Sequence, residues 1–99
     1  MRVVWTRPAI AIRRAIYDRI RIDEPAAAKR VVARLRKRAQ ALLILPNQGR
    51  KGRMEGTFEL VVSNTPYLLI FERTPDCFRI LTFLHHSQQW PPAEMQGDR

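Results

Sequence analysis

The chain has 99 residues, of which 45% are hydrophobic and 27% are charged. This length supports one domain with a single modest core, and the composition excludes an intrinsically disordered chain. The formal net charge of +9, with a pI near 11.3, predicts an anionic partner, either a polyanion or an acidic protein.

Cysteine content and apolar runs indicate the compartment. Cys77 is the only cysteine, which excludes an intrachain disulfide and favours a reducing environment. We predict that it is a small buried residue near a strand start. The N-terminus lacks the apolar core of a signal peptide, and runs such as 41–45 are too short to cross a bilayer. We therefore expect a cytoplasmic protein, and no sequence feature calls for a cofactor or metal.

The first elements are a strand and a helix. Residues 2–6 are predicted to form an opening strand, and Thr6 can cap the helix that follows, with Pro8 in its first turn. Isoleucines at four-residue spacing predict the buried face of this helix, with an alanine and a tyrosine beside them. These residues are Ile12, Ile16 and Ile20, flanked by Ala9 and Tyr17.

A second helix is predicted from Asp23 as its N-cap to about Leu45, where Pro46 and Asn47 stop it, and Pro25 lies in its first turn. Its link to the first helix is short, so the two should form an antiparallel hairpin. Its predicted buried stripe is Ala28, Val31, Leu35 and Leu42, with Val32 and Ala39 beside it. Its basic face is Lys29, Arg30, Arg34, Arg36, Lys37 and Arg38. Such a face is usually only the solvated side of a helix.

A loop over residues 46–56 follows, and it holds three cations and three glycines: Arg50, Lys51 and Arg53, with Gly49, Gly52 and Gly56. It is also a charge boundary, because residues 1–53 hold 15 Lys/Arg against 3 Asp/Glu, whereas residues 54–99 hold 3 against 6. Amides made accessible by Gly49 and Gly52, together with the cations, are predicted to bind phosphates or carboxylates. The alternative is a solvated loop that only aids solubility. The P-loop signature is absent, so nucleotide hydrolysis is not supported.

Three short runs rich in aromatic and branched residues then predict strands, at 58–62, 67–72 and 78–84. Turn residues separate them, so an antiparallel meander should result, with one face free for the helices. The predicted fold class is α+β with the order β-α-α-β-β-β, an antiparallel sheet packed against a helical hairpin. The domain should span residues 1–90, followed by a flexible C-terminal tail at 91–99. Trp5, Phe71 and Phe83 are predicted core residues, whereas Trp90 should pack the tail or meet a partner.

Three segments together resemble one family. They are Arg-Ala-Ile-Tyr-Asp-Arg-Ile at 14–20, Gly-Arg…Gly-Thr-Phe-Glu-Leu-Val-Val at 49–62, and a C-terminal half that joins Thr65-Pro66-Tyr67 to Arg79-Ile80-Leu81-Thr82-Phe83-Leu84-His85. Over residues 2–90 the chain resembles the ParE/RelE superfamily of type II toxins, and most closely its ParE branch. The resemblance implies the same topology and a cognate antitoxin. It also implies one of two targets, since ParE-like members act on DNA gyrase and RelE-like members cleave mRNA on the ribosome.

RNA cleavage would need a base, a phosphate clamp and an acid. The candidates are Glu59 as base, Arg73 or Arg79 as clamp, and His85 or His86 as acid. The resemblance counts against this set. Leu68 stands where mRNA-cleaving relatives usually carry an arginine, and Glu72, near their strand-end Arg or Gln, would repel a phosphate. The two histidines should point to opposite faces of a strand and so are not predicted to share a metal.

We therefore expect a ParE-like toxin that inhibits DNA gyrase by binding rather than by catalysis and forms a hetero-oligomer with its antitoxin. The expected target-binding residues are Arg50, Lys51 and Arg53, then Arg73, Arg79 and His85. One alternative is a ribosome-dependent endoribonuclease that uses Glu59, Arg79 and His85. A second is a degenerate member kept only for antitoxin binding or autoregulation.

Overall fold

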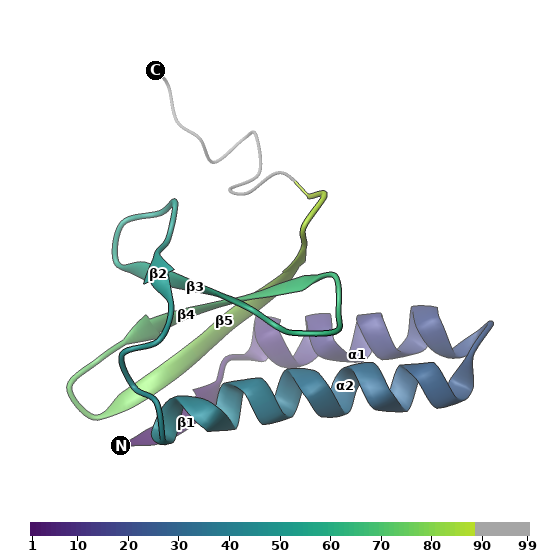
Figure 1. Cartoon of the computed structure of the whole chain (residues 1–99), viewed down its shortest axis with the longest axis horizontal. Helices are drawn as coiled ribbons and strands as arrows, with labels where there is room; N and C mark the ends of the chain where they lie inside the picture. The colour runs from purple at the N-terminus through teal and green to yellow at the C-terminus, as the bar shows by residue number, and fades with distance from the viewer. Residues whose placement is uncertain (89–99) are drawn as a thin grey trace.

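The computed structural model describes residues 1–88, so the predicted tail and Trp90 lie outside the described residues. Two helices lie side by side across one face of a five-stranded sheet (Figure 1). The elements are β1 (Arg2–Trp5), α1 (Arg7–Arg21), α2 (Pro25–Gln40), the 3-10 turn η1 (Ala41–Leu43), β2 (Arg50–Lys51), β3 (Thr57–Val61), β4 (Tyr67–Arg73) and β5 (Cys77–His85). The predicted α+β class and helical hairpin are confirmed.

The sheet has the strand order β1-β5-β4-β3-β2. Strands β3, β4 and β5 form the predicted antiparallel meander. Two features correct the prediction of an antiparallel sheet with four strands. β1 runs parallel to β5, with Arg2 opposite Cys77, because no short hairpin joins these strands and fixes their direction. The predicted cationic loop also contains the short strand β2, which pairs with β3.

Helix α1 begins as predicted, at the Thr6 cap. The Thr6 hydroxyl oxygen accepts the N–H of Ala9 at 3.2 Å, and the hydroxyl donates to the carbonyl of Ile80 at 2.7 Å. The cap therefore also fastens the start of α1 to β5. Ala9 and Ile16 are buried, but Ile12 is 36% exposed. The four-residue spacing therefore identified the face of α1 that packs on the sheet. Ile12 is partly exposed because it lines a groove that is described below.

Helix α2 differs from the prediction at both ends. Its N-cap is Glu24 rather than Asp23, with no side-chain capping bond. The α-helix ends at Gln40 and tightens into η1 instead of continuing to Leu45. The N–H groups of Ile44 and Leu45 both donate to the carbonyl of Ala41, so a tighter helical turn fills the chain up to Pro46, which restricts only the residue before it. The buried stripe is confirmed for Ala28, Leu35, Ala39 and Leu42, whereas Val31 and Val32 are only half-buried.

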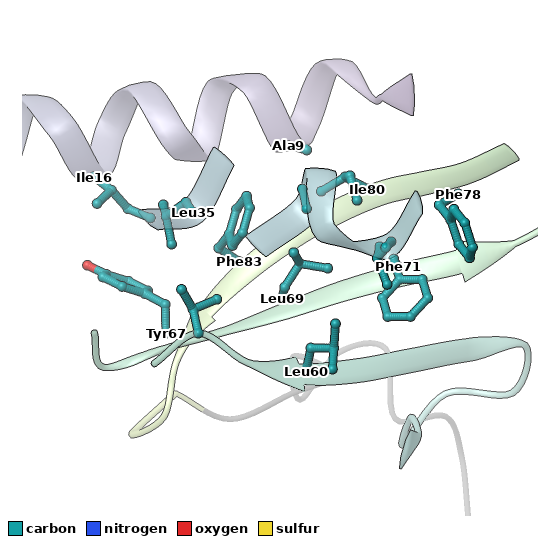
Figure 2. Close-up of a cluster of buried hydrophobic side chains, with 13 residues drawn as sticks. Ala9, Ile16, Leu35, Leu60, Tyr67, Leu69, Phe71, Phe78, Ile80 and Phe83 are labelled. Carbon is teal, nitrogen blue, oxygen red and sulfur yellow. The ribbon is translucent and has the colours of Figure 1, made fainter. Parts of the chain in front are cut away.

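The core lies between the helices and the sheet. Ile16 from α1 and Leu35 from α2 lie close to Phe83 (Figure 2). Leu69 and Phe71 belong to the same buried cluster. The predictions for Phe71, Phe83 and buried Cys77 are confirmed. Trp5 is half-buried, and its ring centroid lies 5.5 Å from that of Phe83. Arg13 covers the outer side of the Trp5 ring at 4.6 Å. Burial lowers the pKa of the Arg13 guanidinium, and the cations Arg36 and Arg14 lower it further.

Side-chain alternation divides the sheet into two faces. Residues such as Leu60, Leu69 and Phe71 belong to the core and point to the helices. Their strand neighbours Glu59 and Ile70 therefore point to the opposite face, which we call the helix-free face. This face also carries Glu72, next to Phe71, and Arg79, next to Phe78 and Ile80. The division between the two faces determines which candidate site residues can act together.

Candidate functional site

The cationic loop is a hairpin. Strand β2 places Arg50 opposite Glu59 and Lys51 opposite Phe58. The N–H of Gly52 donates to the carbonyl of Thr57 at 2.7 Å. A Cβ at Gly52 would lie 2.2 Å from the Thr57 hydroxyl oxygen, so only glycine allows this approach. The prediction of free glycine amides for an anion is therefore wrong at Gly52, because the hairpin uses that donor.

The side chain of Glu59 holds the hairpin in place from the helix-free face of the sheet. Its side chain is only 2% exposed and accepts the main-chain N–H of Arg53 at 3.1 Å. The Nε of Arg53 lies 3.2 Å from the same carboxylate, and Nη2 of Arg50 lies 3.5 Å from it. A buried carboxylate needs such partners, because an unpaired charge is costly in a dry environment. Glu59 is therefore surrounded by cations and shielded from solvent.

Arg73 fastens the other end of the loop. Its guanidinium lies 4.2 Å from the centroid of the Phe58 ring and donates to the carbonyl of Pro46 at 2.8 Å. The Phe58 ring stacks in turn on Phe71, with centroids 5.5 Å apart. The sequence prediction did not foresee this role for Phe58.

The predicted target-binding residues fall into separate groups. Arg50 and Arg53 lie with Glu59 on the helix-free face, together with Arg79, whose Nη1 is 2.8 Å from Glu72. Lys51 lies on the opposite side of the hairpin, because it faces Phe58 across the ladder. Within residues 1–88 the side chain of Lys51 has no hydrogen bond or ion pair.

His85 lies at the far end of β5. It pairs with Tyr67 across the ladder, and the two rings meet edge to face with centroids 5.6 Å apart. The His86 ring stacks on His85 at 4.7 Å, so the prediction that the two point to opposite faces is wrong. The reason is that β5 ends at His85 and alternation stops there. In the described part of the chain, no three His, Cys, Asp or Glu side chains gather as metal ligands.

The alternative catalytic set does not converge in this structure. Arg79 and His85 lie six positions apart on one strand, which corresponds to about 20 Å at 3.3 Å per residue. His85 is on the helix side with Tyr67, whereas Glu59 and Arg79 are on the helix-free face. A base, clamp and acid for one phosphodiester must all lie within hydrogen-bond reach of it.

A groove of 760 Å³ lies between α1 and the strand ends near His85. Ile12, Ile16 and Phe83 form apolar walls, and Nη2 of Arg19 donates to the Tyr67 hydroxyl at 2.7 Å. We call this the α1 groove. It was not predicted from the sequence, and the partial exposure of Ile12 is its clearest sign.

Comparison with known proteins places this architecture in a family. The model of the ParE toxin of the type II toxin–antitoxin system, parDE, matches residues 3–90. The chain belongs to the ParE toxin family. This ParE toxin is 41% identical over 90 residues to the candidate toxin Y4kP of Sinorhizobium fredii (strain NBRC 101917 / NGR234). That alignment covers 91% of this chain and 93% of Y4kP.

The fold of this ParE toxin also matches a chain in a solved structure of the chromosomal ParDE TA system from P. aeruginosa. The TM-score is 0.78 at 25% identity, covering 86% of this chain and 95% of the other. The predicted family, fold and place in a type II toxin–antitoxin system are thus confirmed, and the system implies an antitoxin partner. None of the helices within residues 1–88 of the toxin has the length and apolar character needed to span a membrane.

Proposed function

We propose that this ParE toxin inhibits DNA gyrase by binding to it in the cytoplasm, and that a cognate antitoxin neutralises the toxin by forming a hetero-oligomer with it. The observation that supports binding rather than catalysis is the burial and pairing of Glu59. Its carboxylate is buried under Arg50 and Arg53, on the opposite side of the sheet from His85. The hairpin thus offers positioned cations without an accessible acid–base pair.

The hairpin is suited to recognition because two of its cations, Arg50 and Arg53, are paired before a partner arrives. Arg50 and Arg53 are anchored by Glu59, and Arg73 is anchored on Phe58. A side chain already ordered loses less conformational entropy on binding. Arginine also pairs with two oxygens of a carboxylate or phosphate at once. Lys51, unpaired within the described residues, is the hairpin cation most available to the target.

The α1 groove supports the antitoxin part of the proposal. The apolar side chains of Ile12, Ile16 and Phe83 can contact the apolar side of a peptide or helix. Arg19, which also lines the groove, can bind a carboxylate. A net charge of +9 favours an acidic antitoxin segment. This electrostatic attraction should affect the association rate of toxin and antitoxin more than their dissociation rate, and it should weaken as the salt concentration rises.

The decisive experiment measures two activities of the purified toxin in parallel, inhibition of gyrase supercoiling and cleavage of ribosome-bound mRNA. We expect inhibition of supercoiling without cleavage. Lys51→Glu should weaken inhibition by about tenfold, the effect of losing one good ion contact of roughly 1.4 kcal/mol. Lys29→Glu, which makes the same charge change on α2, is the matched control and should retain inhibition.

Other outcomes would redirect the proposal. Cleavage of mRNA with supercoiling untouched would reject gyrase and favour the ribosome-dependent endoribonuclease. Absence of both activities, together with normal growth of the native host on expression, would favour a degenerate toxin kept for antitoxin binding. Equal weakening by Lys51→Glu and Lys29→Glu would remove the hairpin from the mechanism.

A further inference from the structure

Helix α2 carries an unbalanced set of charges. Its sequence, Pro-Ala-Ala-Ala-Lys-Arg-Val-Val-Ala-Arg-Leu-Arg-Lys-Arg-Ala-Gln, has six basic residues and no acidic one. Within residues 1–88 none of the six forms an ion pair. Three of them, Arg34, Lys37 and Arg38, line a groove of 330 Å³ between α2 and the turn that joins β3 to β4. We call this the α2 groove.

Two of these cations are held in place by main-chain carbonyls. Nη1 of Arg34 donates to Asn64 O at 3.3 Å, and Nε of Arg38 donates to Val61 O at 3.3 Å. Arg38 also donates to the side chain of Gln48. A guanidinium has five N–H donors, so each arginine keeps donors for a ligand. The groove therefore has positioned, half-buried cations that lack a carboxylate partner among the described residues.

The rest of the lining favours an acidic peptide over a single-stranded nucleic acid. Ala41 and Val62 provide apolar surface along the groove. No aromatic side chain lines the groove, so it offers no ring on which a base could stack. A peptide that combines carboxylates with small apolar side chains matches both parts of this surface.

The two grooves flank the same turn. Ser63 and Asn64 line the α2 groove, and Pro66 and Tyr67 line the α1 groove. Only Thr65 separates these pairs, so a segment a few residues long can pass from one groove to the other.

We propose that an acidic segment of the antitoxin binds in the α2 groove, with its carboxylates on Arg34, Lys37 and Arg38, and that the adjoining apolar part of the same antitoxin occupies the α1 groove. The α2 groove is thus a second anion-binding site, separate from the hairpin that faces the target. This proposal rests on the antitoxin part of the proposed function and does not depend on gyrase being the target.

The first test uses the full-length toxin and a short fluorescent peptide in which Glu alternates with Leu, compared with a peptide of the same length that has Gln in place of Glu. Fluorescence anisotropy should show binding of the Glu peptide only. Lys37→Glu should weaken binding by about tenfold, whereas Lys29→Glu should change it by less than about twofold. The control is matched because both lysines are exposed on α2 and only Lys37 lines the groove. Equal losses would overturn the groove and leave only general charge attraction.

A second variant blocks the groove without changing charge. Ser63 is exposed on the groove wall, so Ser63→Trp should fill it and weaken peptide binding while gyrase inhibition stays unchanged. Unchanged peptide affinity in Ser63→Trp would contradict the proposal. Duplex DNA serves as the rival probe. DNA that binds more tightly than the peptide, and loses that binding in Lys37→Glu but not in Lys29→Glu, would overturn the peptide assignment.

The supercoiling assay on the same samples separates the two proposals. If peptide binding depends on Lys37 but the toxin does not inhibit gyrase, the α2 groove proposal stands and gyrase is rejected as the target. If the toxin inhibits gyrase but Lys37→Glu leaves peptide binding unchanged, gyrase stands as the target and the α2 groove proposal is rejected.

Discussion

The carboxylate of Glu59 accepts the main-chain N–H of Arg53 at 3.1 Å and lies 3.2 Å from the Nε of the same residue. One acidic side chain thereby holds both the backbone and the side chain of the hairpin's last cation. Because Glu59 itself is buried, it cannot meet a substrate without the hairpin opening. We infer that it is a positioning residue for the hairpin.

Glu59→Gln should loosen the hairpin. The amide can still accept one hydrogen bond but no longer offsets the charges of Arg50 and Arg53, and part of this effect is screened because both arginines are exposed. We expect the free energy of unfolding to fall by about 1–2 kcal/mol, measured by urea denaturation. Hydrogen exchange at the Arg53 amide should also accelerate. Glu55→Gln, at an exposed position of the same loop, is the control. If the Arg53 amide exchanges at its original rate in Glu59→Gln, the positioning role is rejected.

Arg73→Lys should test the stack on Phe58. Lysine keeps the charge but loses the planar group that covers the ring and bonds to Pro46. The expected loss of stability is about 1 kcal/mol, seen as a lower melting temperature. Arg79→Lys, which retains a simple ion pair with Glu72, should cost less than about 0.5 kcal/mol. A larger effect for Arg79→Lys than for Arg73→Lys would show that the stack does not hold the loop.

Gly52→Ala should disturb the hairpin by steric contact. Its Cβ would lie 2.2 Å from the Thr57 hydroxyl oxygen and 3.0 Å from two main-chain atoms of Thr57, so the strands must separate. We expect a loss of about 1–3 kcal/mol in unfolding free energy. Gly56→Ala is an informative comparison, since its Cβ meets no atom within 4 Å but its φ of +84° strains the backbone by about 1 kcal/mol. The ranking would be contradicted by a larger loss at Gly56.

His85→Ala should distinguish antitoxin binding from gyrase binding. His85 lines the α1 groove and lies at the far end of β5 from Arg79. If the groove receives the antitoxin, the variant should lose about threefold to tenfold in antitoxin affinity, as for a moderately buried interface contact. Inhibition of gyrase by the free toxin should not change. Isothermal titration with antitoxin and the supercoiling assay measure the two effects, and loss of inhibition alone would return His85 to the target-binding surface.

Local sequence patterns determined much of this fold. The Thr6 cap, the buried stripe formed by Leu35 of α2 and Leu42 of η1, and the three strands of the meander were all predictable. Each follows from contacts between residues near in sequence or from the period of apolar positions. The resemblance of the segments at 14–20 and 49–62 to the toxin superfamily also pointed to the family that the comparisons confirm.

Only the tertiary structure decided how the charged residues are used. From the sequence, Arg50, Lys51 and Arg53 formed one cluster, and Glu59 was a possible base. The pairing of β2 with β3 separates Lys51 from Arg50 and buries Glu59 beneath two arginines. A one-residue difference in register would exchange the faces of all these side chains, and register is set by long-range packing rather than by local preference. Composition by itself predicts an anionic partner, and the folded sheet determines which of the described cations are paired with acidic side chains and which are not.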